Sequence, residues 1–177
     1  KEYDDTNHDM VAGRKKGKTC TFAIIMGAGV GKIGEVLGSY EKGKQAFDNL
    51  KKNIVGWNKF HKEIEYRAGI GFFVGLDGRK VPLKSAHFGM SSYLQAGEAV
   101  IMKRAMVESY KKIKELGLDA FQVAVVHDEM QWDCAEDCAE TVGEILRLNI
   151  IDAGACYNLR CPLDAEYRIG NNWLETH

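Results

Sequence analysis

Three consecutive residues that can bind a metal ion or exchange protons, His127, Asp128 and Glu129, lie between two apolar segments. Both segments alternate as strands do, which predicts a hairpin with these residues at its tip. The side chains expected to oppose one another are Phe121, Val123 and Val125 on one strand and Met130, Trp132 and Cys134 on the other. Because a hairpin fixes its tip, a carboxylate there is well placed to bind a metal ion. An ordinary solvated turn is the alternative interpretation.

A second set of residues suited to binding chemistry, Arg14, Lys18, Phe22 and Met26, is spaced four positions apart. On a helix each such step rotates by about 40°, so all four stay within about 120° of one another. Arginine and lysine one turn apart can grip phosphate groups, and an aromatic ring offers a flat surface to a base. The β-branched and aromatic residues within 19–25 favour a strand instead, so segment 14–26 is open between helix and strand.

These residues must be positioned by the rest of the chain. Apolar periodicity predicts helices at 41–54, 57–68, 90–116 and 136–151. Segment 71–83 reads as a hairpin with Asp77-Gly78 at its turn, and 159–169 reads as extended. With the hairpin around residue 128, this pattern predicts a mixed structure in which helices dominate.

Composition restricts the class of protein. The 177 residues suffice for one sizeable core or two small lobes, and the formal net charge is −1. Basic residues concentrate in the N-terminal half, which permits an anionic partner, although a solvated helix face also accounts for the later lysines. Five cysteines in no paired zinc pattern favour a reduced, cytoplasmic protein. No apolar run is long enough to span a membrane, so no membrane partner is expected.

The stretch Gly29-Val-Gly31-Lys-Ile-Gly34 matches the dinucleotide-binding pattern G-x-G-x-x-G and follows an apolar run. Asp48 lies near the distance expected of a ribose partner, so a nucleotide-cofactor-binding domain is a competing hypothesis. Two features weaken it. Asp48 falls inside a predicted amphipathic helix, and the chain lacks the alternation of strands and helices that a doubly wound sheet requires.

Two motifs in order carry a resemblance to a known family. The pattern Arg14-x3-Lys18-x3-Phe22-x3-Met26-Gly27 is similar to motif B of the family A DNA polymerases, in particular the T7-like phage branch. The sequence Val126-His127-Asp128-Glu129 is similar to motif C of the same family. Between them, segment 75–81 and a helix around Gln95 fall in the family's order, and residues 170–177 resemble the T7-like terminus.

The resemblance implies an α+β fold, with a helical fingers lobe beside a small antiparallel palm sheet in an incomplete polymerase fold. Residues 1–70 would form a fingers-like helical region, and 71–177 the remaining fingers and the C-terminal palm. A palm sheet lacking at least one strand predicts an exposed sheet edge and exposed apolar surface.

The resemblance also implies roles in nucleotidyl transfer to a primer 3′-hydroxyl. Asp128 would bind Mg²⁺ in a two-metal site, with His127 and Glu129 supporting the primer end or the metal shell. Arg14 and Lys18 would hold the triphosphate of a dNTP. The other residues with an implied contact are Phe22 and Met26 for the nucleotide, and Gln95, Arg79 and His127 for primer-template DNA.

The chain departs from the family's pattern in two places. Met26 stands where the family usually has tyrosine, which removes a flat ring and a hydroxyl. The Asp-bearing motif A strand is absent, and Asp4, Asp5 and Asp9 have no flanking strand, so none of them is assigned as a ligand. The expected protein is therefore inactive alone and acts with a separate N-terminal chain that carries motif A, either as a split-gene product or as a fragment, in the cytoplasm of a phage-infected bacterial cell. A non-catalytic, polymerase-derived DNA-binding module is the further alternative.

Overall fold

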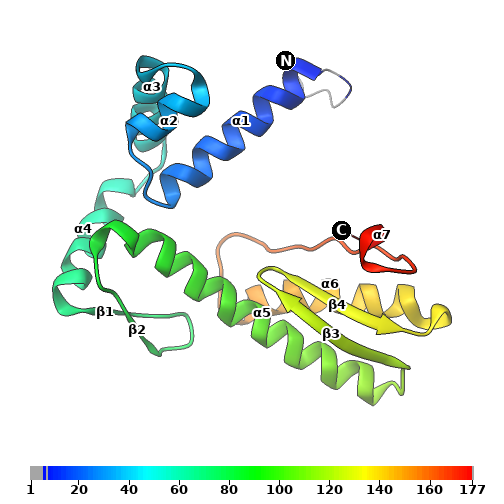
Figure 1. Cartoon of the computed structure of the whole chain (residues 1–177). Coiled ribbons are helices and arrows are strands. Elements are labelled where there is room, and N and C mark those ends of the chain that lie inside the picture. The colour runs from blue at the N-terminus through cyan, green and yellow to red at the C-terminus, as the bar shows by residue number, and fades with distance from the viewer. Residues whose placement is uncertain (1–5, 7, 177) are drawn as a thin grey trace. The chain divides into compact units, whose positions relative to one another are not determined.

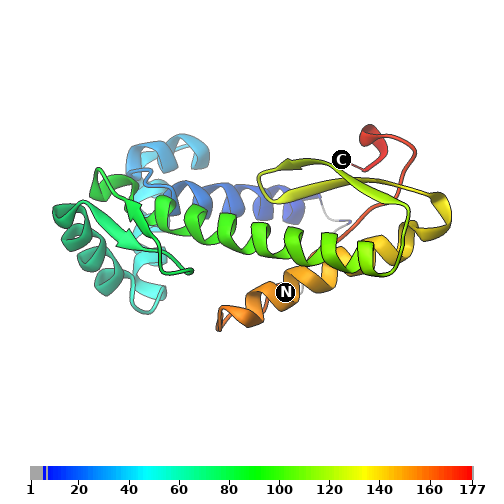
Figure 2. The same ribbon diagram turned by 90° about the horizontal axis from the view of Figure 1, so that it is seen from below.

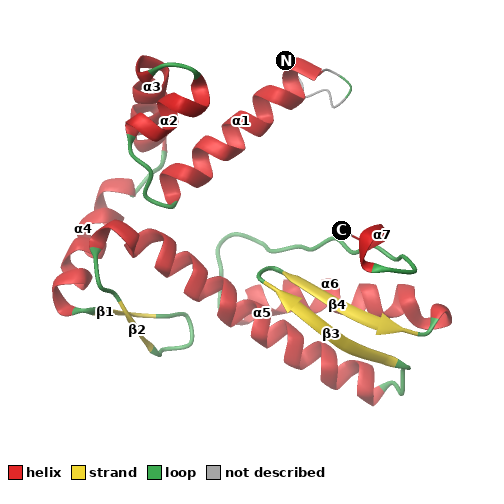
Figure 3. Ribbon diagram, viewed as in Figure 1, coloured by secondary structure: helices red, strands yellow, loops and turns green. Residues whose placement is uncertain are grey.

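The computed structural model describes residue 6 and residues 8–176, which divide into two compact units (Figure 1). One unit comprises Lys1–Val74 with Lys80–Leu94, and the other Gly75–Arg79 with Gln95–His177. Asp4, Asp5 and His177 lie outside the described residues. Helices dominate both units, and the strands form two separate antiparallel pairs (Figure 3). The α+β class is confirmed.

The first unit is a group of helices followed by a short hairpin. Its elements are α1 (His8–Ile25), α2 (Val30–Leu37), α3 (Tyr40–Asn53), α4 (Trp57–Ile70), β1 (Phe72–Val74), β2 (Lys80–Pro82), η1 (Ala86–Phe88) and the start of α5 (Gly89–Glu115). Cys20 and Ile24 of α1 pack with Ile33 of α2 and Trp57 of α4 in the core. Segment 14–26 is therefore helical, and its strand propensity is overridden because one helical face can be buried against α2 and α4.

The end of α1 explains why glycine follows Met26. The N–H of Gly27 donates to the Ile24 carbonyl (3.0 Å), and the N–H of Ala28 donates to the Ala23 carbonyl (2.8 Å). This pair of bonds is a Schellman cap, which requires positive φ, and Gly27 has φ 93°. A Cβ at position 27 would also lie 2.9 Å from the carbonyl oxygen of His87. Any larger residue would therefore be strained and would collide with η1.

The glycine-rich stretch has a packing role, so the cofactor-domain hypothesis is wrong. A helix, α1, precedes it where a parallel strand is required, and the two sheets of the described residues are antiparallel. Gly34 in α2 faces Gly43 in α3 so closely that a Cβ on Gly43 would lie 2.5 Å from the Gly34 nitrogen. The glycines therefore permit two helix backbones to touch.

The second unit places a hairpin on two helices. Its elements are the rest of α5, β3 (Ala120–Val126), β4 (Glu129–Cys134), η2 (Glu136–Cys138), α6 (Ala139–Cys156) and α7 (Trp173–Thr176). Its core joins Ile113 of α5, Ala120 of β3 and Val142 of α6, with Trp132 of β4 packed against them. The view in Figure 2 shows α5 and α6 beside the hairpin. One face of the hairpin is thus buried on helices.

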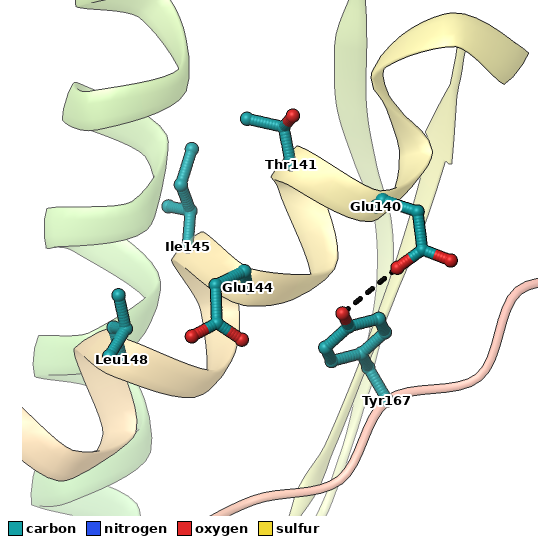
Figure 4. A pocket seen from close by; sticks show the side chains of 6 residues that line it. All are labelled: Glu140, Thr141, Glu144, Ile145, Leu148 and Tyr167. Carbon is teal, nitrogen blue, oxygen red and sulfur yellow. Dashed lines mark hydrogen bonds between the residues drawn. The ribbon is translucent and has the colours of Figure 1, made fainter.

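The segment after α6 has no helix or strand until α7, and it packs along α6. A Cβ on Gly143 would lie 2.4 Å from the ring of Tyr167, so the missing side chain makes room for that ring. The Tyr167 hydroxyl donates to Glu140 (3.0 Å), which raises the pKa of Tyr167. Figure 4 shows both side chains at an open hollow of about 470 Å³ on this helix.

The same segment is also held by Arg147, whose guanidinium donates to Glu144 (2.9 Å) and Asp164 (2.8 Å). The pKa of Asp164 is lowered, first by the backbone N–H of Ala165 and then by Arg147. The folded pKa therefore lies below the unfolded value of about 3.9. The stabilisation is complete above the unfolded value and is lost as pH falls through the folded value.

Acidification should accordingly loosen this segment from α6. We expect the amide signal of Ala165, followed by NMR, to shift with a midpoint below the ordinary range of aspartate. Asp164→Asn should abolish that titration and leave the signals of α5 unchanged. A midpoint at or above the ordinary range would contradict the assigned contacts.

Candidate functional site

On α1, Arg14, Lys18 and Phe22 lie on the face opposite the buried one. At about 100° per residue, Lys18 is rotated by about 160° from Cys20, which is buried. All three side chains are exposed, and Phe22 keeps 53% of its surface accessible. The face that packs α1 onto its unit and the face that carries Arg14, Lys18 and Phe22 are therefore distinct.

The α1 face continues to Met26 without a break. The Met26 N–H donates to the Phe22 carbonyl (2.8 Å), which extends the helical hydrogen bonding by one residue. The Lys18 ammonium lies 5.8 Å from the centre of the Phe22 ring, at the outer limit of a cation–π contact. Met26 is 42% exposed. A ligand can thus meet an arginine, a lysine, an aromatic ring and a thioether along one stripe.

The tip of the second hairpin is the two-residue loop that sequence predicts. Val126 of β3 pairs with Glu129 of β4, which leaves His127 and Asp128 as the loop. His127 has φ 54°, a left-handed conformation that costs a non-glycine residue about 1–2 kcal/mol. Both loop side chains are exposed. The loop therefore presents a carboxylate and an imidazole to solvent at some conformational cost.

The expected facing of the two strands is correct at Val125 and wrong at Phe121 and Val123. Phe121 pairs with Asp133 and Gln122 with Trp132, whereas Val125 pairs with Met130, because a bulge lies between Gln122 and Ala124. One extra residue in β3 shifts its alternation, so Phe121 and Val125 face opposite sides. Bulges often occur beside functional sites, where they redirect the end of a strand.

The face of the hairpin away from the helices carries exposed apolar side chains. Phe121 is 67% exposed, the bulged Val123 is 64% exposed, and Val126 is 41% exposed. The sheet has two strands, so β3 and β4 each pair along one edge only. The exposed edge and apolar surface expected of an incomplete sheet are therefore present in the described second unit.

Two further predicted DNA contacts lie in the second unit. Arg79 follows the Asp77-Gly78 turn of the first hairpin, and its Nε donates to Asp77 (2.5 Å). This hydrogen bond lowers the pKa of Asp77 and raises that of Arg79. Arg79 is thus already engaged by a carboxylate, which an incoming phosphate would have to displace. Gln95 is exposed on α5.

His87, to which we assign no ligand, lies in the first unit and packs its ring against Phe88.

The donor atoms at the hairpin suit part of a magnesium site. Asp128 and Glu129 are adjacent oxygen donors, and Mg²⁺ commonly uses one or two carboxylates together with water and substrate phosphates. Among the described residues, no cluster of three or more His, Cys, Asp or Glu side chains could hold a metal ion. The described residues at the hairpin tip therefore offer two neighbouring carboxylates and no larger ligand cluster.

Sequence reasoning missed Gln131, which contacts a predicted site residue. Its Nε2 donates to the Glu129 carboxylate, two positions away on β4. The period of two along a strand, which places both side chains on one face, is the signal that could have found it.

The predicted residues divide between the two units. Arg14, Lys18, Phe22 and Met26 belong to the first, and Arg79, Gln95 and the hairpin residues 127–129 belong to the second. Within each unit the residues of one motif lie together, the first motif along α1 and its C-terminal end and the second at the tip of the β3–β4 hairpin. None of the helices in the described part of the chain is long and apolar enough to cross a membrane.

Three known proteins that are similar to this chain are DNA polymerases. It is 31% identical over 189 residues to the DNA-directed DNA polymerase of Enterobacteria phage T3 and 30% identical over 189 residues to that of Escherichia phage T7. Each alignment covers 93% of this chain and 27% of the phage protein, so the chain spans about a quarter of these relatives. DNA polymerase I of Pseudomonas aeruginosa is 30% identical over 178 residues, covering 93% of this chain and 19% of that protein.

The fold of this chain is also similar to that of a polymerase domain of known structure. The POL domain of Pol1 from M. smegmatis, in complex with DNA primer-template and dNTP, superposes with a TM-score of 0.71 and 20% identity. The match covers 85% of this chain and 28% of that one, which confirms part of a polymerase fold. The family description "DNA polymerase family A" matches residues 2–175, which include both α1 and the hairpin that carries Asp128. The chain therefore belongs to DNA polymerase family A.

Proposed function

We propose that this chain supplies the fingers and the C-terminal palm of a DNA-templated DNA polymerase that extends a primer from its 3′-hydroxyl. The observation that carries the proposal is the family match, which spans the exposed stripe of α1 and the carboxylate at the hairpin tip. Mg²⁺, when bound, supplies charge neutralisation and activation of the 3′-hydroxyl. Residues 1–70 would be fingers, and residues 71–177 the remaining fingers and palm.

The α1 stripe would bind the incoming nucleotide. Arg14 can grip two phosphate oxygens with its planar guanidinium, and Lys18, one turn on, adds a compact positive charge. The Phe22 ring, half exposed on the same stripe, supports the sugar and base. Phosphoryl transfer depends on positioning and charge more than on covalent participation, which suits this set of residues.

The hairpin would bind the primer end and the metal. Asp128 is the proposed ligand, with His127 and Glu129 beside it. The strain at His127 supports a functional role, since glycine or asparagine would adopt the same φ at lower cost. Gln95 would donate to minor-groove acceptors that all base pairs share, and Arg79 would contact the backbone of the duplex.

The second carboxylate of the metal site must come from a motif A strand outside residues 1–177. The two-stranded sheet supports this proposal, because β3 and β4 each have one unpaired edge along which an additional strand could pair. Whether that strand belongs to a separate chain or to the same polypeptide is a question that the neighbouring reading frame answers directly.

Complementation tests the proposal. We expect no primer extension from this chain alone with Mg²⁺ and dNTPs. Extension should appear when the chain replaces the matching segment of the phage T7 polymerase, which supplies motif A. Robust extension by the chain alone would contradict the need for a second carboxylate. A folded chimera that binds primer-template without extending it would instead indicate a non-catalytic DNA-binding module.

The absence of a hydroxyl on Phe22 predicts a sugar preference. The resemblance implies that phenylalanine here rejects nucleotides lacking the 3′-hydroxyl. In Phe22→Tyr, the phenol can replace a hydrogen bond that the missing hydroxyl would have made, so we expect dideoxynucleotide use to rise about 10–100-fold, as one hydrogen bond to a charged group allows. Competition between dideoxy- and deoxynucleotides measures it. An unchanged ratio in an active Phe22→Tyr chimera would place Phe22 away from the sugar.

A further inference from the structure

Gln131 and Glu129 form a side-chain pair on β4 of the second unit. They lie two positions apart on the same face of the strand, and their cross-strand partners Ala124 and Val126 are both apolar. The Gln131 Nε2 donates to Glu129 Oε1. Both residues are half-buried, so the contact is partly shielded from solvent. The hydrogen bond therefore holds the Glu129 carboxylate against β4. Glu129 itself directly follows the loop that carries Asp128.

The chemistry of the pair sets the orientation of the amide. A carboxylate accepts hydrogen bonds and donates none, so the NH₂ end of Gln131 must face Glu129. The carbonyl end of Gln131 then faces α7, where the Thr176 hydroxyl lies 3.5 Å away. The short helix α7 is itself held by a cap in which Glu175 accepts the Asn171 N–H (2.7 Å) and Asn172 accepts the Glu175 N–H (3.2 Å).

The two hydrogen bonds of Gln131 differ in strength. The bond to Glu129 has an ionised acceptor, which makes such bonds roughly twice as strong as neutral ones. The Thr176 hydroxyl has a nearer acceptor in the Trp173 carbonyl, at 3.1 Å against 3.5 Å, so it contributes little to Gln131. The hydrogen bond to Glu129 is therefore the stronger of the two contacts that Gln131 makes.

We propose that Gln131 is a positioning residue for Glu129, and this inference rests on the proposed polymerase function. The amide holds the carboxylate in one orientation beside the metal-binding aspartate, so that ordering it costs nothing when primer and nucleotide bind. Removing a group that orients a residue of a metal site typically lowers the activity of the enzyme about 10–100-fold. Gln131→Glu is the most informative substitution, because glutamate has nearly the same shape as glutamine. It removes the amide donor and adds a second negative charge next to Glu129.

A double-mutant cycle in the active chimera tests the assignment. We expect Gln131→Ala to lower the single-turnover rate constant of nucleotide incorporation about tenfold, with the dNTP dissociation constant within about twofold. Gln131→Glu should lower that rate constant further. In a Glu129→Ala background, Gln131→Ala should have no additional effect, because the group that it positions is gone. Thr176→Ala should change the rate constant less than threefold. The control Gln45→Glu makes the same substitution at an exposed position of α3 and should leave the rate constant unchanged.

The outcomes separate this inference from the proposed function. If Asp128→Asn abolishes extension while Gln131→Ala and Gln131→Glu retain the full rate constant, Gln131 does not position Glu129 and the polymerase function stands. If the effects of Glu129→Ala and Gln131→Ala simply multiply, Gln131 has a general structural role and the inference is overturned. If extension survives Asp128→Asn, the proposed function itself fails. Thermal unfolding midpoints, measured for each variant, show that all comparisons are made between folded proteins.

Discussion

Asp128→Asn should abolish primer extension by a polymerase that contains this chain. The amide keeps the shape of the side chain but loses the negative charge that a Mg²⁺ ligand supplies. Stabilisation of the transition state by a bound metal is worth several kcal/mol, so a loss of about 10³-fold or more in the rate constant is expected. Single-turnover incorporation of one nucleotide measures the loss. The fold should survive, because Asp128 is exposed in a loop and lies outside the buried core of its unit.

The control for Asp128 is on the same hairpin. Asp133 is an exposed aspartate of β4 and pairs with Phe121, at the end of the hairpin away from the loop. Asp133→Asn removes the same charge and should leave the rate constant within about twofold, as is usual for surface substitutions. Equal losses for Asp128→Asn and Asp133→Asn would point to general electrostatics of the hairpin and would refute the assignment of Asp128 as a ligand.

Lys18→Ala should be the second large effect, with a loss of about 10²–10³-fold in the rate constant of incorporation, as for other groups that stabilise developing charge. The ammonium would lie against the triphosphate, where negative charge builds up on the leaving pyrophosphate. The nucleotide dissociation constant should rise as well, because the same charge binds the ground state. Single-turnover kinetics over a range of dNTP concentrations resolve both quantities.

Lys16 provides a matched control on the same helix. It is an exposed lysine two residues before Lys18, and helical geometry rotates it by about 160° from that residue. Lys16→Ala changes the net charge by the same amount and preserves helix propensity equally. It should leave the rate constant within about threefold, since surface substitutions away from a site usually have small effects. Similar losses for the two variants would show that α1 acts through its overall charge and not through one face.

Most helices and hairpins of this chain can be predicted from the local pattern of apolar and polar residues. The helix expected at 90–116 is α5 (Gly89–Glu115), and the Asp-Gly turn expected at 77–78 joins β1 and β2. Periodicity decides these elements because each buries one face, and the side-chain period follows the local backbone. For α1 the local pattern is ambiguous between helix and strand. Packing of Cys20 and Ile24 against α2 and α4 decided it, and such packing depends on residues distant in sequence.

The two motifs of the candidate site, and with them the family, were determined by the sequence alone, since residue type and spacing along one helix or around one turn are local properties. Tertiary structure alone decided two other matters. A bulge sets the facing of β3 against β4, and contact between Gly34 and Gly43 explains the glycine-rich stretch. Each depends on which backbone approaches which, and that is fixed only when the whole unit packs.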